Sequence, residues 1–215
     1  MADGDHLLLL GGLDGNDQTT AEVLQIDPRS GSITDVGTLT SAVHDAAGAL
    51  VGRLVLVFGG GNANETAHVQ SFVPGSGSRT VGQLPIRRAD LAAATVGGRT
   101  FLVGGYDGST IRASVLATTD GMKFDILGDL PVPVRYPAVA ALGSEIYVVG
   151  GSNGAGGVRA VQVLDTRTGA VRTAGELPQT LTDAVAATLG EHIYVFGGTW
   201  GGEPSDQVWR LDIDA

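Results

Sequence analysis

Five glycine pairs divide this sequence at nearly equal intervals, and that repeat restricts the fold more than any other feature. Each pair follows a short apolar run: "LLLL", "LVLVF", "FLV", "IYVV" or "IYVF". Runs that are apolar on both alternations are typical of strands buried on both faces. The successive offsets between pairs are 48, 45, 46 and 47 residues, and the pairs are Gly11-Gly12, Gly59-Gly60, Gly104-Gly105, Gly150-Gly151 and Gly197-Gly198.

Two further landmarks keep fixed distances from the last four pairs. A leucine stands 20 residues before each pair, at Leu39, Leu84, Leu130 and Leu177, and Pro follows it in three of the four cases. A glycine comes 13 residues after each leucine, at Gly52, Gly97, Gly143 and Gly190. Such spacing predicts a hairpin. Small residues fill the stretch between leucine and glycine, which favours a strand near a crowded axis.

A polar loop of variable length follows each glycine pair, and a strand that begins with valine comes next, as in "VLQID" and "VQVLD". In three repeats a glycine lies eight residues after that valine, where a turn leads to a more exposed strand such as "SITDV". Each unit therefore contains four antiparallel strands, here called a to d with a innermost. The sequence predicts an all-β fold, a β-propeller of four-stranded antiparallel blades.

The glycine pair after an apolar strand, the "LP" that marks the next unit and the period resemble the kelch-repeat family, over nearly the whole chain. The usual kelch pattern carries a Tyr and a Trp in strands c and d. Here Trp209 alone stands in a c strand, and no d strand has Trp.

We expect one domain, residues 1–215, with about five blades of which the first and last are incomplete. The first blade is expected to lack its innermost strand and the last its outermost, so the chain would stop short of a closed five-bladed ring. A six-bladed ring with one further repeat, or an irregular closure, stays open. Open edges could pair with another chain and give a homo-oligomer. The expected blades are residues 6–38, 39–83, 84–129, 130–176 and 177–214.

Composition limits the function classes. The formal net charge is −10, and an acidic surface disfavours nucleic acid and anionic membranes as partners. The absence of cysteine excludes thiolate chemistry but does not fix the compartment. No apolar stretch is long enough to span a bilayer, so we expect a soluble domain, which could be the extracytoplasmic part of a larger protein.

Loops on a rigid scaffold carry function, and the kelch resemblance implies that the b–c and d–a loops share one face. The arginines and aromatics of these loops suggest a pocket for a protein, an acidic peptide or an anionic small ligand, because guanidinium groups pair with carboxylates. Surface arginines paired with neighbouring aspartates are the alternative. The candidate binding residues are Arg87, Arg88, Tyr106, Arg112, Arg135, Tyr136, Arg159 and Trp200.

Three aspartates and one tyrosine share a position six residues beyond the leucine: Asp45, Asp90, Tyr136 and Asp183. Repetition favours a structural role at a turn, and a carboxylate ring that binds a cation at the channel mouth is the alternative. The loop "DGNDQ" lacks EF-hand spacing, and the histidines are dispersed, so we expect no metal site and no cofactor.

No Walker sequence or nucleophile elbow is present. We therefore expect no catalytic residues and a non-catalytic ligand-binding or protein-binding module, the sensor or adaptor part of a larger protein. The alternative is a carbohydrate-acting enzyme that resembles sialate mutarotases or propeller glycosidases, for which converging carboxylates at the channel mouth would be the sign.

Overall fold

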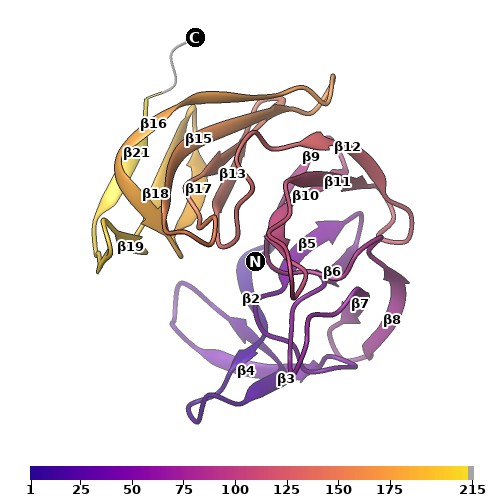
Figure 1. The fold of residues 1–215 in the computed structure, drawn as a ribbon. Coiled ribbons are helices and arrows are strands. Elements are labelled where there is room, and N and C mark those ends of the chain that lie inside the picture. The colour runs from indigo at the N-terminus through magenta and orange to yellow at the C-terminus, as the bar shows by residue number, and fades with distance from the viewer. Residues whose placement is uncertain (213–215) are drawn as a thin grey trace.

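A computed structural model describes residues 1–212 and shows five antiparallel sheets, one per repeat, arranged in sequence order around a common axis (Figure 1). The predicted all-β propeller is confirmed. The first sheet holds β1 (Ala2–Asp3), β2 (His6–Leu13), β3 (Thr19–Ile26) and β4 (Ile33–Thr38). The second holds β5 (Ala47–Val51), β6 (Leu54–Phe58), β7 (His68–Val73) and β8 (Gly77–Gln83).

The third sheet holds β9 (Ala89–Val96), β10 (Arg99–Tyr106), β11 (Ser114–Thr118) and β12 (Asp125–Asp129). The fourth is built on β13 (Ala138–Leu142), β14 (Glu145–Val149), β15 (Val158–Asp165) and β16 (Val171–Thr182), and a small hairpin of β19 (Thr199–Trp200) and β20 (Glu203–Pro204) extends it. The fifth holds β17 (Val185–Leu189), β18 (His192–Phe196) and β21 (Val208–Leu211).

The two ends of the chain differ from each other. The first blade was expected to lack its innermost strand. In the structure β1 takes that place and pairs with β2 through two residue pairs. The terminal ammonium of Met1 donates to the carbonyl of Leu8 and extends this pairing. The last blade has three strands among the described residues, and the end of its expected range, residues 213–214, lies outside them.

The glycine pairs lie where neighbouring blades touch. The first glycine of each of the first four pairs has φ between 62° and 65°, and a Cβ there would lie 2.2–2.4 Å from a carbonyl oxygen of the segment that leads into the next blade. The second glycine donates its N–H to that same carbonyl, as Gly105 does to Val134 at 2.8 Å. A side chain would be strained by the backbone angle and would also collide with the next blade, so glycine is required.

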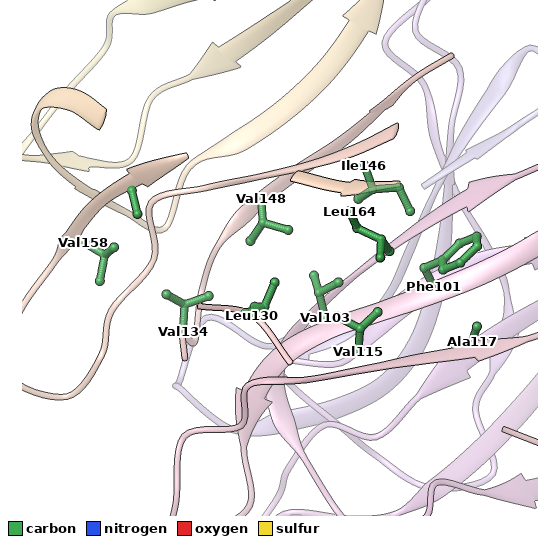
Figure 2. Packing of buried hydrophobic residues seen from close by; sticks show 11 residues of the cluster. Phe101, Val103, Val115, Ala117, Leu130, Val134, Ile146, Val148, Val158 and Leu164 are labelled. Carbon is green, nitrogen blue, oxygen red and sulfur yellow. The ribbon is translucent and has the colours of Figure 1, made fainter. Parts of the chain in front are cut away.

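The core lies between adjacent blades, and Figure 2 shows the part between the third and the fourth, where Phe101 and Val103 of β10 face Ile146 and Val148 of β14. All four side chains are at most 1% exposed. The apolar runs at the centre of β10 and β14 are therefore buried on both alternations, because each of these two sheets packs on both faces.

Candidate functional site

The b–c and d–a loops meet at one end of the blades. Arg135 in a d–a loop exchanges backbone hydrogen bonds of 2.9 and 2.8 Å with Ser152 in the b–c loop of the following blade. His44 and Gly61 make the same contact two blades earlier, at 2.9 and 2.8 Å. The d–a loops and the b–c loops thus form one surface.

A cavity of about 690 Å³ opens on this surface between the third and fourth blades. Two of the predicted binding residues, Tyr106 and Arg135, line it. The other lining residues come from the two b–c loops and the d–a loop between them: Ser109, Thr110, Ile111, Val132, Pro133, Asn153 and Gly154. A cavity of this size could hold a short peptide side chain or a small molecule.

Arg135 lies between aromatic rings at the edge of this cavity. Its guanidinium carbon is 5.0 Å from the ring centroid of Tyr106 and 4.5 Å from that of Tyr136. One terminal nitrogen donates to the Tyr136 hydroxyl at 2.6 Å, and Nε lies 2.9 Å from a carboxylate oxygen of Asp90. The side chain of Arg135 is 29% exposed whereas that of Asp90 is 4% exposed, so the arginine is the part of the pair that a ligand could touch.

The environment of Asp90 changes its acidity. Burial raises the pKa of Asp90 to about 6, against the opposing effect of Arg135, and the neighbouring carboxylate of Asp45 raises it further. Burial also raises the pKa of the Tyr136 hydroxyl above its ordinary value. The charge that faces Arg135 therefore titrates in the mildly acidic range.

Two further predicted residues organise a loop beside the cavity. Arg112 forms an ion pair with the buried Asp107, and Arg87 donates from Nε to the Asp107 carbonyl at 2.8 Å. The Asp107 carboxylate also accepts the backbone N–H groups of Ser109 and Thr110, at 2.8 and 2.7 Å. Asp107, which was not among the predicted binding residues, is thus the centre that shapes this b–c loop.

Arg88 lies beneath the face instead of on it. It is 1% exposed, and its guanidinium donates to the Gly104 carbonyl and to the carbonyl and hydroxyl of Ser114, at 3.1, 3.0 and 2.8 Å. Burial, with the nearby charge of Arg112, lowers the pKa of Arg88 to about 10. In this position it ties the third blade's strands together.

Arg159 and Trp200 are not gathered with the others. Arg159 donates from Nε to the Leu177 carbonyl at 2.7 Å and lies 3.3 Å from Glu176. The ring of Trp200 stacks on Trp209, with centroids 4.8 Å apart and planes at 12°, beside a separate cavity of about 370 Å³ between β16 and β21.

The four residues that share a repeat position line a cavity of about 430 Å³ at the channel mouth. All four have φ between 53° and 59°. The N–H of Asp90 donates to the Asp45 carbonyl at 2.8 Å, that of Tyr136 to Asp90 at 2.9 Å, and that of Asp183 to Tyr136 at 3.4 Å. Their repetition thus reflects a hydrogen-bonded backbone, and Asp is among the side chains that tolerate this conformation best.

Among residues 1–212 no group of three or more His, Asp or Glu side chains is arranged to hold a metal ion. Within the same residues there is no helix long and apolar enough to cross a membrane.

Comparison with known families supports the repeat seen in the structure. The family model described as the Kelch motif matches residues 133–178 and 181–215, which correspond to the fourth and fifth blades. Propellers of this kind are typically protein-binding modules. No curated protein matches the chain.

Proposed function

Because this chain is a β-propeller whose fourth and fifth blades match the Kelch motif, we propose that it is a non-catalytic binding module whose loop face takes an acidic peptide or an anionic group of a protein. The observation that carries the proposal is Arg135, held between two tyrosine rings at the rim of the 690 Å³ cavity. A fixed guanidinium loses little entropy when it pairs with a carboxylate, and flanking rings exclude water from the pair.

The buried Asp90 competes with such a ligand. When Asp90 is ionised, Arg135 is already paired, and when Asp90 is protonated, the guanidinium is released for an external carboxylate. Binding of an acidic ligand whose own carboxylates stay ionised should therefore strengthen as the pH falls from about 7 to about 5.

The test uses a defined probe, the peptide Ac-EEDGEE-amide, with Ac-QQNGQQ-amide as its neutral control. We expect the acidic peptide to bind the full chain, measured by calorimetry, and the variant Arg135→Gln to lose most of that affinity. Arg135→Gln/Asp90→Asn leaves no buried charge unpaired and separates lost binding from lost folding. The matched control is Arg53→Gln, an exposed arginine at the opposite end of the second blade. Equal binding by wild type and both Arg135 variants would overturn the proposal.

The alternative of a carbohydrate-acting enzyme draws support from one observation, the raised pKa of Asp90 beside the carboxylate of Asp45. Asp90, however, is almost fully buried and ion-paired with Arg135, so it lacks the access to substrate that a general acid needs. We expect no hydrolysis of 4-nitrophenyl glycosides. Turnover that Asp90→Asn abolishes would favour the enzyme.

A further inference from the structure

The exposed fractions of side chains in the b strands show which side chains face a neighbouring blade and which face solvent. In β6, Val55, Leu56 and Val57 are each at most 3% exposed, because the blade has a neighbour on both sides. In β2, Leu8 is 3% exposed while Leu7 and Leu9 are 42% and 52% exposed. One alternation of β2 therefore packs on the second blade, and the other has no neighbour among the described residues.

The fifth blade shows the opposite alternation. Ile193 and Val195 of β18 are at most 2% exposed against the fourth blade, whereas Phe196 is 42% exposed. Its partner across the pair, Val185 of β17, is 66% exposed and Leu189 is 72% exposed. We call the side chains Leu7, Leu9 and Leu13 the first end face, and Val185, Leu189 and Phe196 the last end face. Figure 1 shows these blades, indigo and yellow, at the two ends of the series.

Main-chain groups of the two end blades also lack partners that their counterparts in the other blades have. In the first four glycine pairs the second glycine donates to a carbonyl of the next blade, at 2.7–2.9 Å. Gly198 makes no such bond within residues 1–212. At the inner edge of the first blade, β1 pairs with only two residues of β2, whereas β9 pairs with seven residues of β10 in the third blade. An extended segment of another chain could supply hydrogen-bond partners both to Gly198 and to the sparsely paired edge of β2.

The distribution of charge along the chain indicates the charge of a segment that would bind at the end faces. Residues 1–38 hold seven carboxylates and one arginine, and residues 177–215 hold six and one. The three middle blades, residues 39–176, hold ten carboxylates and eleven basic residues. The chain's net negative charge thus belongs to the two end blades, at −6 and −5, whereas the middle blades carry +1. Exposed carboxylates such as Asp5 and Glu191 lie in the turns beside the end faces.

We propose that the two end faces bind a positively charged, strand-forming segment of a partner protein, with apolar side chains between its Lys and Arg residues. The apolar side chains would cover Leu9 and Phe196, and the basic ones would pair with the carboxylates at the rims. A second copy of this chain fits less well, because its end blades carry the same negative charge and would repel these. This surface is separate from the cavity beside Arg135.

The experiment uses the full chain and the extended peptide KRVTVKVRK. We expect it to bind, with affinity that falls about tenfold or more between low and high salt, because charge attraction is screened. Two control peptides divide the contributions: KRSTSKSRK keeps the charge without the apolar side chains, and EEVTVEVEE keeps the apolar side chains and reverses the charge. Both should bind at least about tenfold more weakly.

Matched variants locate the site. Leu9→Ser/Phe196→Ser should lose binding about tenfold, whereas Ile126→Ser, which removes a similarly exposed side chain from β12, should not. Glu191→Gln should weaken binding more than Asp129→Asn in the third blade. Hydrogen exchange should slow in β2 and β18 when the peptide is present. Thermal unfolding confirms that each variant is folded.

Three results would overturn the proposal. The first is a lack of binding by KRVTVKVRK, or equal binding of KRSTSKSRK. The second is an equal effect of Ile126→Ser and Leu9→Ser/Phe196→Ser. The third is a stable dimer at low salt that the Leu9→Ser/Phe196→Ser variant converts to monomer, because a second copy would then be the occupant of the end faces. None of these measurements depends on Arg135.

Discussion

At the scale of single residues, the first glycine of a pair has two roles that can be separated: it adopts a positive φ, and it leaves room for the carbonyl of the next blade. Gly104 and Gly197 have nearly the same φ, 65° and 60°. A Cβ on Gly104 would lie 2.3 Å from the Val134 carbonyl of the next blade, whereas one on Gly197 would meet nothing closer than 3.4 Å. The backbone angle is thus shared, and the contact with a neighbouring blade differs.

We expect Gly104→Ala to destabilise the fold considerably more than Gly197→Ala. The shared φ should cost about 1 kcal/mol in each, and displacement of the Val134 carbonyl should add about 2 kcal/mol in Gly104→Ala alone. Urea denaturation of both variants measures the difference in unfolding free energy. Equal losses would show that the backbone angle alone selects the glycine pair.

A second residue-scale prediction concerns pH. Burial raises the pKa of Asp90 from 3.8 to about 6, so the folded state binds this proton more tightly than the unfolded state. The resulting stability is complete below about pH 4 and is lost as the pH rises through about 6. Asp90→Asn should therefore flatten the fall in unfolding free energy between about pH 4 and about pH 7. Asp129→Asn serves as the control, and an unchanged slope in Asp90→Asn would contradict the assignment.

At the scale of strands and loops, buried glutamines hold d–a loops in place. The side chain of Gln162 in β15 is fully buried and bonds both the N–H and the carbonyl of Val132, at 2.8 and 3.0 Å. Gln70 in β7 makes the same two bonds with Ser41, at 2.8 and 3.1 Å. Each d–a loop so held then contributes to the loop face.

Gln162→Leu should leave two backbone groups of Val132 without their partner and destabilise the protein by about 2–3 kcal/mol. Because Val132 lines the cavity beside Arg135, binding of the acidic peptide should weaken as well. Gln25→Leu, on the less buried strand β3, is the control for the substitution itself. Denaturation and calorimetry on both variants check the prediction, and a stability equal to wild type in Gln162→Leu would refute it.

The sequence predicted the b and a strands well, because glycine pairs and hairpin glycines recur at fixed spacing. It missed β1, since two residues carry no periodicity. Nothing in its pattern showed that β16 continues past Leu177, the landmark of the fifth repeat, to Thr182, where Leu181 and Thr182 pair with β19. The burial of Arg88 and the pairing of Arg135 with Asp90 also escaped prediction, because both depend on residues that are distant in sequence and meet only in the folded chain.

At the scale of the whole molecule, the charges are segregated. The two end blades are strongly acidic and the middle three are nearly neutral, while both end faces are apolar. Attraction between apolar faces and repulsion between like charges therefore oppose each other when two copies meet. Salt screens the repulsion and strengthens apolar association, so both effects of salt favour self-association.

We expect a monomer at low salt and increasing self-association at about 1 M salt, where the Debye length falls to about 3 Å. Light scattering coupled to size exclusion measures the mass. Leu9→Ser/Phe196→Ser should remain monomeric under both conditions. Self-association that decreases with salt would mean that ion pairs, instead of apolar end faces, bring the copies together.

The hydrogen bonds from Asp45 through Asp90 and Tyr136 to Asp183 have a mechanical consequence. Each of four blades contributes one residue, and three hydrogen bonds join these residues in one line around the channel mouth. A force that parts two adjacent blades must stretch one of these bonds along its length, whereas a force that bends an outer strand leaves all of them intact. The channel mouth should therefore resist mechanical separation of the blades, while the outer strands of each blade bend more easily.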